Sequence, residues 1–107
     1  MSANSLVCVV RFEWDPDKAA RNRARHDVTF DEAKALFRSS EDVLEIYDVE
    51  HSEVEDRFIS IGPIRRGLVL VVWTERSEDV IRIVSARWAT KVETKLYREF
   101  MEDRHER

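Results

Sequence analysis

The stretch "LVLVVWTERSEDVIRIVSAR", residues 68–87, decides the fold. Two runs rich in β-branched residues, 68–75 and 80–87, flank the polar residues RSED, a pattern that is typical of two strands joined by a turn. The first run is apolar at successive positions, so we expect an interior strand that is covered on both faces. "DRFISIG" (56–62) predicts a further strand, joined to the first run by the short connection PIRRG.

The N-terminal part predicts a strand followed by a helix. Residues 6–14, "LVCVVRFEW", have the composition of a strand. Asp15 and Pro16 then supply an N-cap and a first helical residue, and the helix is expected to end near His26.

A second helix is expected over residues 30–38, because Thr29 and Glu32 form a capping box before an amphipathic run. We expect the two helices to form a hairpin joined near Asp27. Gly or Asn would suit a left-handed helix end better than Asp, so this joint is strained or differently shaped.

A short strand at 43–47 and a C-terminal helix within 89–107 complete the order of elements. The last helix begins at a second capping box, Thr90-x-x-Glu93. The sequence therefore predicts one α+β domain, residues 1–107, with an antiparallel β-sheet, an N-terminal helical hairpin and a C-terminal helix.

Charge is unevenly distributed along the chain. Residues 41–56 carry eight acidic and no basic residues, so removing them changes the net charge from −4 to +4. The mildly basic remainder permits a polyanionic partner without requiring one.

The sequence indicates a cytoplasmic protein without cofactors or membrane partners. The single cysteine, Cys8, cannot form an internal disulfide, and no stretch has the pattern of a signal peptide or a membrane span. His26, His51 and His105 lack metal-ligand spacing, and there is no glycine-rich phosphate loop, so we expect no metal and no nucleotide cofactor.

The residues that suggest chemistry are cationic. Three arginines lie on predicted strands, Arg57, Arg82 and Arg87, and a second group, Lys18, Arg21 and Arg25, forms one stripe of the first helix. Arginine binds phosphate oxygens bidentately and stabilises charge that develops on a phosphoryl group.

The alternative is structural. In that case the strand arginines pair with Glu55, Asp56 or Glu75 across strands. Strict alternation also sends Arg82 and Arg87 to opposite faces of the sheet, so both line one site, with Ser85 beside them, only if a β-bulge intervenes.

Three separated segments resemble the signature of the BrnT toxins of BrnT–BrnA type II toxin–antitoxin modules. They are "FEWDPDKAARNRARHDVTFDEA", "DVEHSEVEDRFISIG" and "LVVWTERSEDVIRIVSARWATKVE", and the resemblance covers about residues 12–97. The matching positions are Phe12, Glu13, Trp14, Asp15, Lys18, Ala19, Asn22, His26, Val28, Phe30, Glu32, Ala33, Asp48, His51, Ser52, Glu55, Arg57, Ile61, Gly62, Arg82, Ile83, Ser85, Ala86, Arg87 and Ala89. The chain departs at Asp27, where the family usually has Gly, and at Trp88, where it commonly has Lys; we expect the loss of that cation to weaken RNA binding or shift substrate choice.

The resemblance implies a RelE-like fold and a metal-independent endoribonuclease that halts translation. It also implies an RNA substrate, neutralisation by a BrnA antitoxin, and contact with DNA only through that antitoxin. On this interpretation Arg57, Arg82 and Arg87 are the phosphate clamp, and Glu55 or His26 is the base. Lys18, Arg21, Arg25 and Ser85 would hold the RNA.

Two other functions stay open. In the first, the chain is a catalytically inactive co-repressor that binds BrnA. In the second, it is a protein-binding module on the same fold. RNA specificity, dependence on the ribosome and the stoichiometry of the complex do not follow from the sequence.

Overall fold

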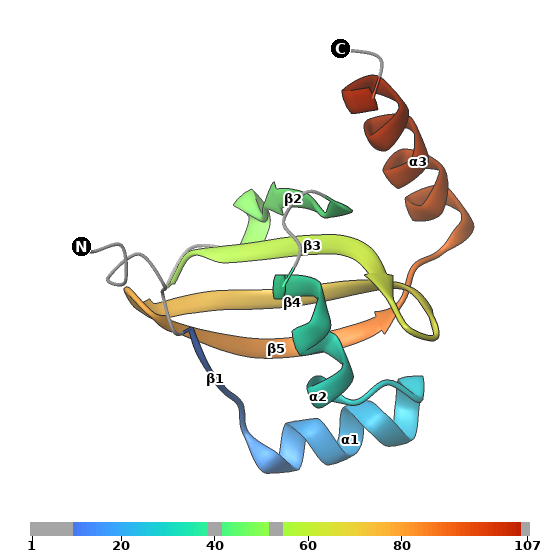
Figure 1. Ribbon diagram of the computed structural model, residues 1–107. Helices are drawn as coiled ribbons and strands as arrows, with labels where there is room; N and C mark the ends of the chain where they lie inside the picture. The colour runs from blue at the N-terminus through green and yellow to red at the C-terminus, as the bar shows by residue number, and fades with distance from the viewer. Residues whose placement is uncertain (1–9, 39–41, 52–54, 106–107) are drawn as a thin grey trace, which may run out of the picture.

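A computed structural model describes residues 10–38, 42–51 and 55–105 and gives an α+β fold around one five-stranded sheet (Figure 1). The elements in chain order are β1 (Arg11–Glu13), α1 (Pro16–His26), α2 (Phe30–Ala33), the 3₁₀ helix η2 (Lys34–Arg38), β2 (Leu44–Tyr47), the 3₁₀ turn η4 (Val49–His51), β3 (Arg57–Ile64), β4 (Gly67–Ser77), β5 (Val80–Trp88) and α3 (Lys91–His105). The predicted strands at 43–47, 56–62, 68–75 and 80–87 are confirmed as β2 to β5.

The strands lie in the order β1-β5-β4-β3-β2, so the apolar strand β4 is interior, as predicted. β2, β3, β4 and β5 are antiparallel neighbours. The prediction of an antiparallel sheet is wrong for β1, because Arg11–Glu13 pairs in parallel with the first part of β5. The sheet is therefore mixed.

The parallel pairing follows from the path of the N-terminal segment. β1 lies beside Val80, Ile81 and Arg82, and Asn22 of the next element, α1, contacts Ala86 farther along the same strand. β1 and α1 thus run along β5 in one direction. The predicted strand over 6–14 is only three residues long where it is described, and residues 6–9, including Cys8, lie outside the described residues.

The core lies between the sheet and α1, α2 and η2. It consists of Val28, Phe30, Ala33, Leu36, Val69, Val71, Trp73, Ile83 and Ala86. Figure 1 shows α1 and α2 on one side of the sheet and α3 projecting away from them. We call the core-bearing side the helix-covered face and the other side the open face.

The N-terminal helical hairpin is not confirmed in the predicted form. α1 ends as expected at Asp27, which adopts the left-handed conformation at φ 57°. The second helix is a single α-turn, begun by the predicted capping box and continued as a 3₁₀ helix. Its buried residues Phe30, Ala33 and Leu36 recur every third position, which matches the three-residue repeat of a 3₁₀ helix.

α3 is confirmed, but two of its large apolar side chains are exposed. Val92 is 79% exposed and Leu96 is 45% exposed. Tyr97 fixes the helix to the body by donating a hydrogen bond of 2.8 Å to the Asp42 carbonyl, and burial raises the pKa of its phenol. No helix in the described part of the chain has the length and apolarity to span a bilayer.

Candidate functional site

A β-bulge in β5 lies within the stretch that carries the candidate residues. Ser85 pairs with Val72 of β4, whereas Ile83 pairs with Trp73. Val84 is therefore the extra residue on β5 and has no partner in the register. A bulge of this kind shifts the alternation of side chains by one position.

The bulge places Arg82, Ser85 and Arg87 on the open face. Ile83 and Ala86 are core residues of the helix-covered face, and the three polar residues occupy the intervening positions. Both arginines can therefore line one surface. A bulge between them was the condition for this that followed from the sequence.

A lateral row of side chains joins Arg82 to the neighbouring strands. Thr74 of β4 pairs with Arg82 on one side and with Arg57 of β3 on the other. Glu13 of β1 pairs with Arg82 from the opposite edge. Since directly paired residues share a face of a sheet, Arg57, Thr74, Arg82 and Glu13 all lie on the open face.

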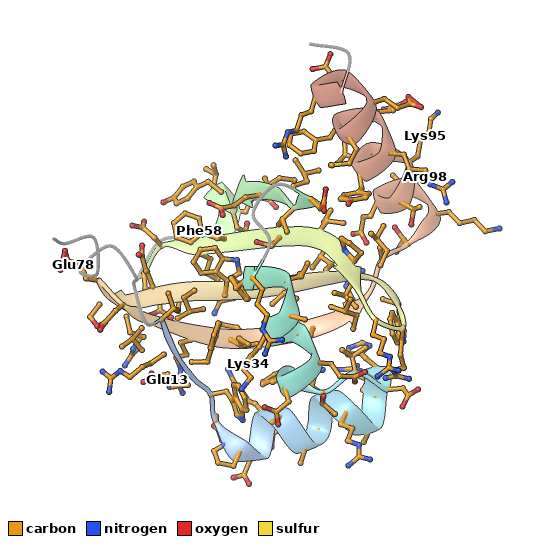
Figure 2. All side chains as sticks on the ribbon, in the orientation of Figure 1. Glu13, Lys34, Phe58, Glu78, Lys95 and Arg98 are labelled. Carbon is orange, nitrogen blue, oxygen red and sulfur yellow. The ribbon has the colours of Figure 1, made fainter. Side chains whose placement is uncertain are left out.

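Charged side chains continue this row into a cluster. Arg82 Nη1 donates a hydrogen bond of 2.9 Å to Glu13 Oε2, and Arg76 Nε lies 3.6 Å from the same oxygen. Arg76 Nη1 also lies 3.5 Å from Glu55 Oε1. We call Glu13, Glu55, Arg76 and Arg82 the charged cluster; Figure 2 shows Glu13 at the β1 edge.

Arg87 lies at the other end of β5 and is bound to α3. Its Nη1 and Nη2 atoms donate to Glu93 Oε1 and Oε2, each over 2.9 Å. The Arg87 guanidinium and the Thr90 backbone N–H lower the pKa of Glu93 to about 2, against the opposing effect of burial. Glu93 in turn raises the pKa of Arg87. The same carboxylate closes the capping box of α3 by accepting from Thr90 N at 2.9 Å.

The structure thus gives Arg82 and Arg87 acidic partners that differ from those considered from the sequence. Arg82 pairs with Glu13 and Arg87 pairs with Glu93. Their partners on β4, Thr74 and Leu70, are four positions apart, roughly 13 Å. The Arg82 guanidinium is bound to β1 and that of Arg87 to α3.

The two candidate bases are far apart. Glu55 contacts Arg76 near the end of β4, whereas His26 precedes Asp27, which contacts Arg66 just before β4 begins. Arg66 and Arg76 are ten positions apart, which corresponds to roughly 33 Å of extended strand. Only Glu55 lies with the charged cluster.

The cationic stripe of the first helix forms a separate surface. Lys18, Arg21 and Arg25 are all exposed on α1. They lie on an element that packs against β5 and the core, while the strand arginines lie on the open face. An RNA that contacts both groups has to pass around the edge of the sheet.

Asp27 and Trp88, the two residues that depart from the family pattern, both contact Arg66. Arg66 lies in the turn between β3 and β4. Arg66 donates to the Asp27 carbonyl and lies 3.3 Å from its carboxylate. The Arg66 guanidinium also stacks 5.1 Å from the centre of the Trp88 ring. Its hydrogen bond to Glu32, together with that from the Thr29 backbone, lowers the pKa of Glu32 to about 2. Trp88 pairs with the core residue Val69, so it lies on the helix-covered face, away from Arg82 and Arg87.

Sequence reasoning assigned no role to Glu13 or Arg76. Glu13 was visible only as one position of the "FEWD" motif, and the 69-residue separation from Arg82 concealed their contact. The parallel pairing of β1 with β5 is what brings them together. Within the described residues, no three His, Cys, Asp or Glu side chains gather in a metal-binding group.

Comparisons with known proteins address the identity of the chain. The model of the family described as "Ribonuclease toxin, BrnT, of type II toxin-antitoxin system" matches residues 14–93. The fold resembles the crystal structure of the Brucella abortus ribonuclease toxin, BrnT, with a TM-score of 0.58 and 19% sequence identity, over 77% of this chain and 99% of that one. No curated protein matches the chain.

Proposed function

The chain belongs to the BrnT family of ribonuclease toxins of type II toxin–antitoxin systems, and we propose that it cleaves RNA at the open face of the sheet without a metal ion. The observation that carries this proposal is the bulge at Val84, which puts Arg82, Ser85 and Arg87 on the same face as Arg57. A surface with several guanidinium groups suits a polyanionic substrate.

The proposed reaction is an internal transesterification. The 2′-oxygen of a ribose attacks the adjacent phosphorus while a base accepts the 2′-hydroxyl proton. The bond from phosphorus to the 5′-oxygen then breaks, and the leaving oxygen takes a proton from water. The products are a 2′,3′-cyclic phosphate and a 5′-hydroxyl, and the reaction needs a base, an acid (here water) and a cationic clamp but no metal.

We assign the scissile phosphate to Arg57 and Arg82. They flank Thr74 in one lateral row, and Glu55 lies in the charged cluster beside them, where it is the proposed base. His26 was the alternative base. The separation along β4 favours Glu55, and a His26→Ala variant that keeps full activity would agree with this choice.

We assign Arg87 and Ser85 to a neighbouring part of the RNA backbone. Arg87 is bound to Glu93 of α3, whereas Arg82 is bound to Glu13 of β1, so the two guanidinium groups are held against different elements. An approaching phosphate would have to share or displace the Glu93 carboxylate. Lys18, Arg21 and Arg25, exposed on α1, are proposed to hold more distant phosphates of the same RNA.

The family implies an antitoxin partner, and we propose a BrnA-type protein that covers the open face. Covering the strand arginines would exclude RNA and leave the toxin inert. DNA would be contacted only through the antitoxin. Cleavage of RNA in the cytoplasm would then inhibit translation whenever the antitoxin is absent.

One observation favours a second function. Arg82 and Arg87 are both paired with carboxylates, as expected of structural arginines in a co-repressor or binding module that has lost catalysis. Expression of the chain alone, with growth and total RNA monitored, separates the possibilities. A toxin arrests growth and fragments RNA, and co-expression of the antitoxin relieves both effects. A co-repressor leaves growth and RNA unchanged.

A further inference from the structure

The outer edge of β5, which is the edge opposite β4, is paired with another strand only along its first part. β1 pairs with β5 only as far as Arg82, the partner of Glu13. In the described part of the chain no strand continues beside the second half of β5, which contains the bulge at Val84 and the candidate residue Arg87. Backbone groups along this edge therefore need other hydrogen-bond partners.

Asn22 of α1 supplies these partners at Ala86. Its Nδ2 donates 2.8 Å to the Ala86 carbonyl, and its Oδ1 accepts from the Ala86 N–H at 3.1 Å. A neighbouring strand would satisfy the same two groups in the same way. The second Nδ2 proton reaches the Val28 carbonyl at 3.1 Å, which ties the loop after α1 to the same point.

We propose that Asn22 is a positioning residue of the ribonuclease site, in that its amide replaces the missing strand and fixes the bulge of β5. Ala86 lies directly between Ser85 and Arg87 and two residues after Val84. A slip of one residue here would exchange the faces of this segment and turn Ser85 and Arg87 away from the RNA. The inference rests on the proposed function, because it concerns the same open face.

The hydrogen bonds of Asn22 indicate that this residue holds the register of β5 rather than only filling space in the core. Asn22 is a buried polar residue, with 8% of its surface exposed, and all three of its hydrogen bonds go to backbone atoms. An apolar residue of similar size would fill the space but leave these buried backbone groups without partners. The polar atoms therefore serve the backbone of β5.

The test compares Asn22→Leu and Asn22→Asp with Ser60→Ala. The Asp variant keeps the shape of the side chain and the acceptor for the Ala86 N–H but loses both donated hydrogen bonds. It replaces the Leu variant in the test if the Leu variant does not fold. Ser60→Ala is the matched control, because it removes another buried hydrogen bond of 2.8 Å, from Trp73, that joins β3 to β4 and does not involve the outer edge of β5. Thermal unfolding and RNA cleavage per folded molecule are measured for each protein.

We expect all three variants to melt at lower temperature and only the Asn22 variants to lose cleavage, by roughly tenfold or more per folded molecule. Adding Arg87→Ala to an Asn22 variant should then cost far less than it costs in the parent, since the guanidinium is already misplaced. Full cleavage by a folded Asn22 variant, or equal losses in Ser60→Ala, would overturn the inference. A parent chain that does not cleave RNA would instead contradict the proposed function, and exchange of the Ala86 amide would still report whether Asn22 holds the bulge.

Discussion

Arg87 and Glu93 form a bidentate ion pair, with both guanidinium–carboxylate hydrogen bonds at 2.9 Å. The pair joins the last residues of β5 to the first turn of α3, and Glu93 also caps that turn through Thr90. A candidate RNA-binding arginine is thus also an anchor of the C-terminal helix. Stability and activity have to be measured together to separate these two roles.

The two partners of this pair give the first prediction. Arg87→Ala and Glu93→Gln both break the ion pair, so each should lower the melting temperature. Only Arg87→Ala removes the guanidinium, and we expect it to reduce kcat/KM for RNA cleavage by roughly tenfold, as for one lost phosphate contact. Glu93→Gln should cleave at least as fast as the parent per folded molecule. Equal activity of the two variants would show that Arg87 is structural only.

The low pKa of Glu93 predicts a pH dependence of stability. Its pKa is about 2 in the folded chain against an ordinary value of 4.5, because Arg87 stabilises the carboxylate. The stabilisation is complete above the ordinary value and is lost as pH falls through the folded value. The melting-temperature difference between the parent and Glu93→Gln should therefore be constant above pH 4.5 and shrink toward pH 2. Glu32 titrates in the same range, but it is present in both proteins and cancels.

The next prediction concerns the contact between Arg82 and the scissile phosphate. If Arg82 stabilises charge in the transition state, Arg82→Ala should reduce the cleavage rate about a hundredfold, or about 3 kcal/mol. Arg76→Ala is the control, because it also removes a cation from Glu13 and should cost much less. Similar losses in both would indicate that the cluster acts through its net charge.

Trp88 gives a prediction about the departure from the family pattern. Its ring packs against Arg66 on the helix-covered face. Trp88→Lys would replace this contact with two like charges and should lower the free energy of unfolding by about 2 kcal/mol. Because the new cation would lie away from Arg82 and Arg87, cleavage per folded molecule should not change. Tighter RNA binding by this variant would contradict the placement of Trp88.

The sequence was informative where local chemistry decides the structure. Asp15 and Thr29 cap their helices as predicted, and the apolar run of β4 lies in the interior. These outcomes depend on residues close in sequence or on the burial of a single run.

The sequence was less informative about long-range pairing. Nothing near Glu13 showed that β1 would lie parallel to β5, so its contact with Arg82 was missed. The need for a bulge between Arg82 and Arg87 was evident from alternation, but its position depends on Asn22, a residue of another element. Such features arise from tertiary packing, which local pattern does not contain.

The most direct test of the central claim is the rate of RNA cleavage by the purified chain in excess EDTA, with the product ends identified. A metal-independent site on the open face predicts an unchanged rate, products with a 2′,3′-cyclic phosphate and a 5′-hydroxyl, and loss of this activity in Arg82→Ala. Activity that EDTA abolishes and a divalent cation restores would contradict the claim.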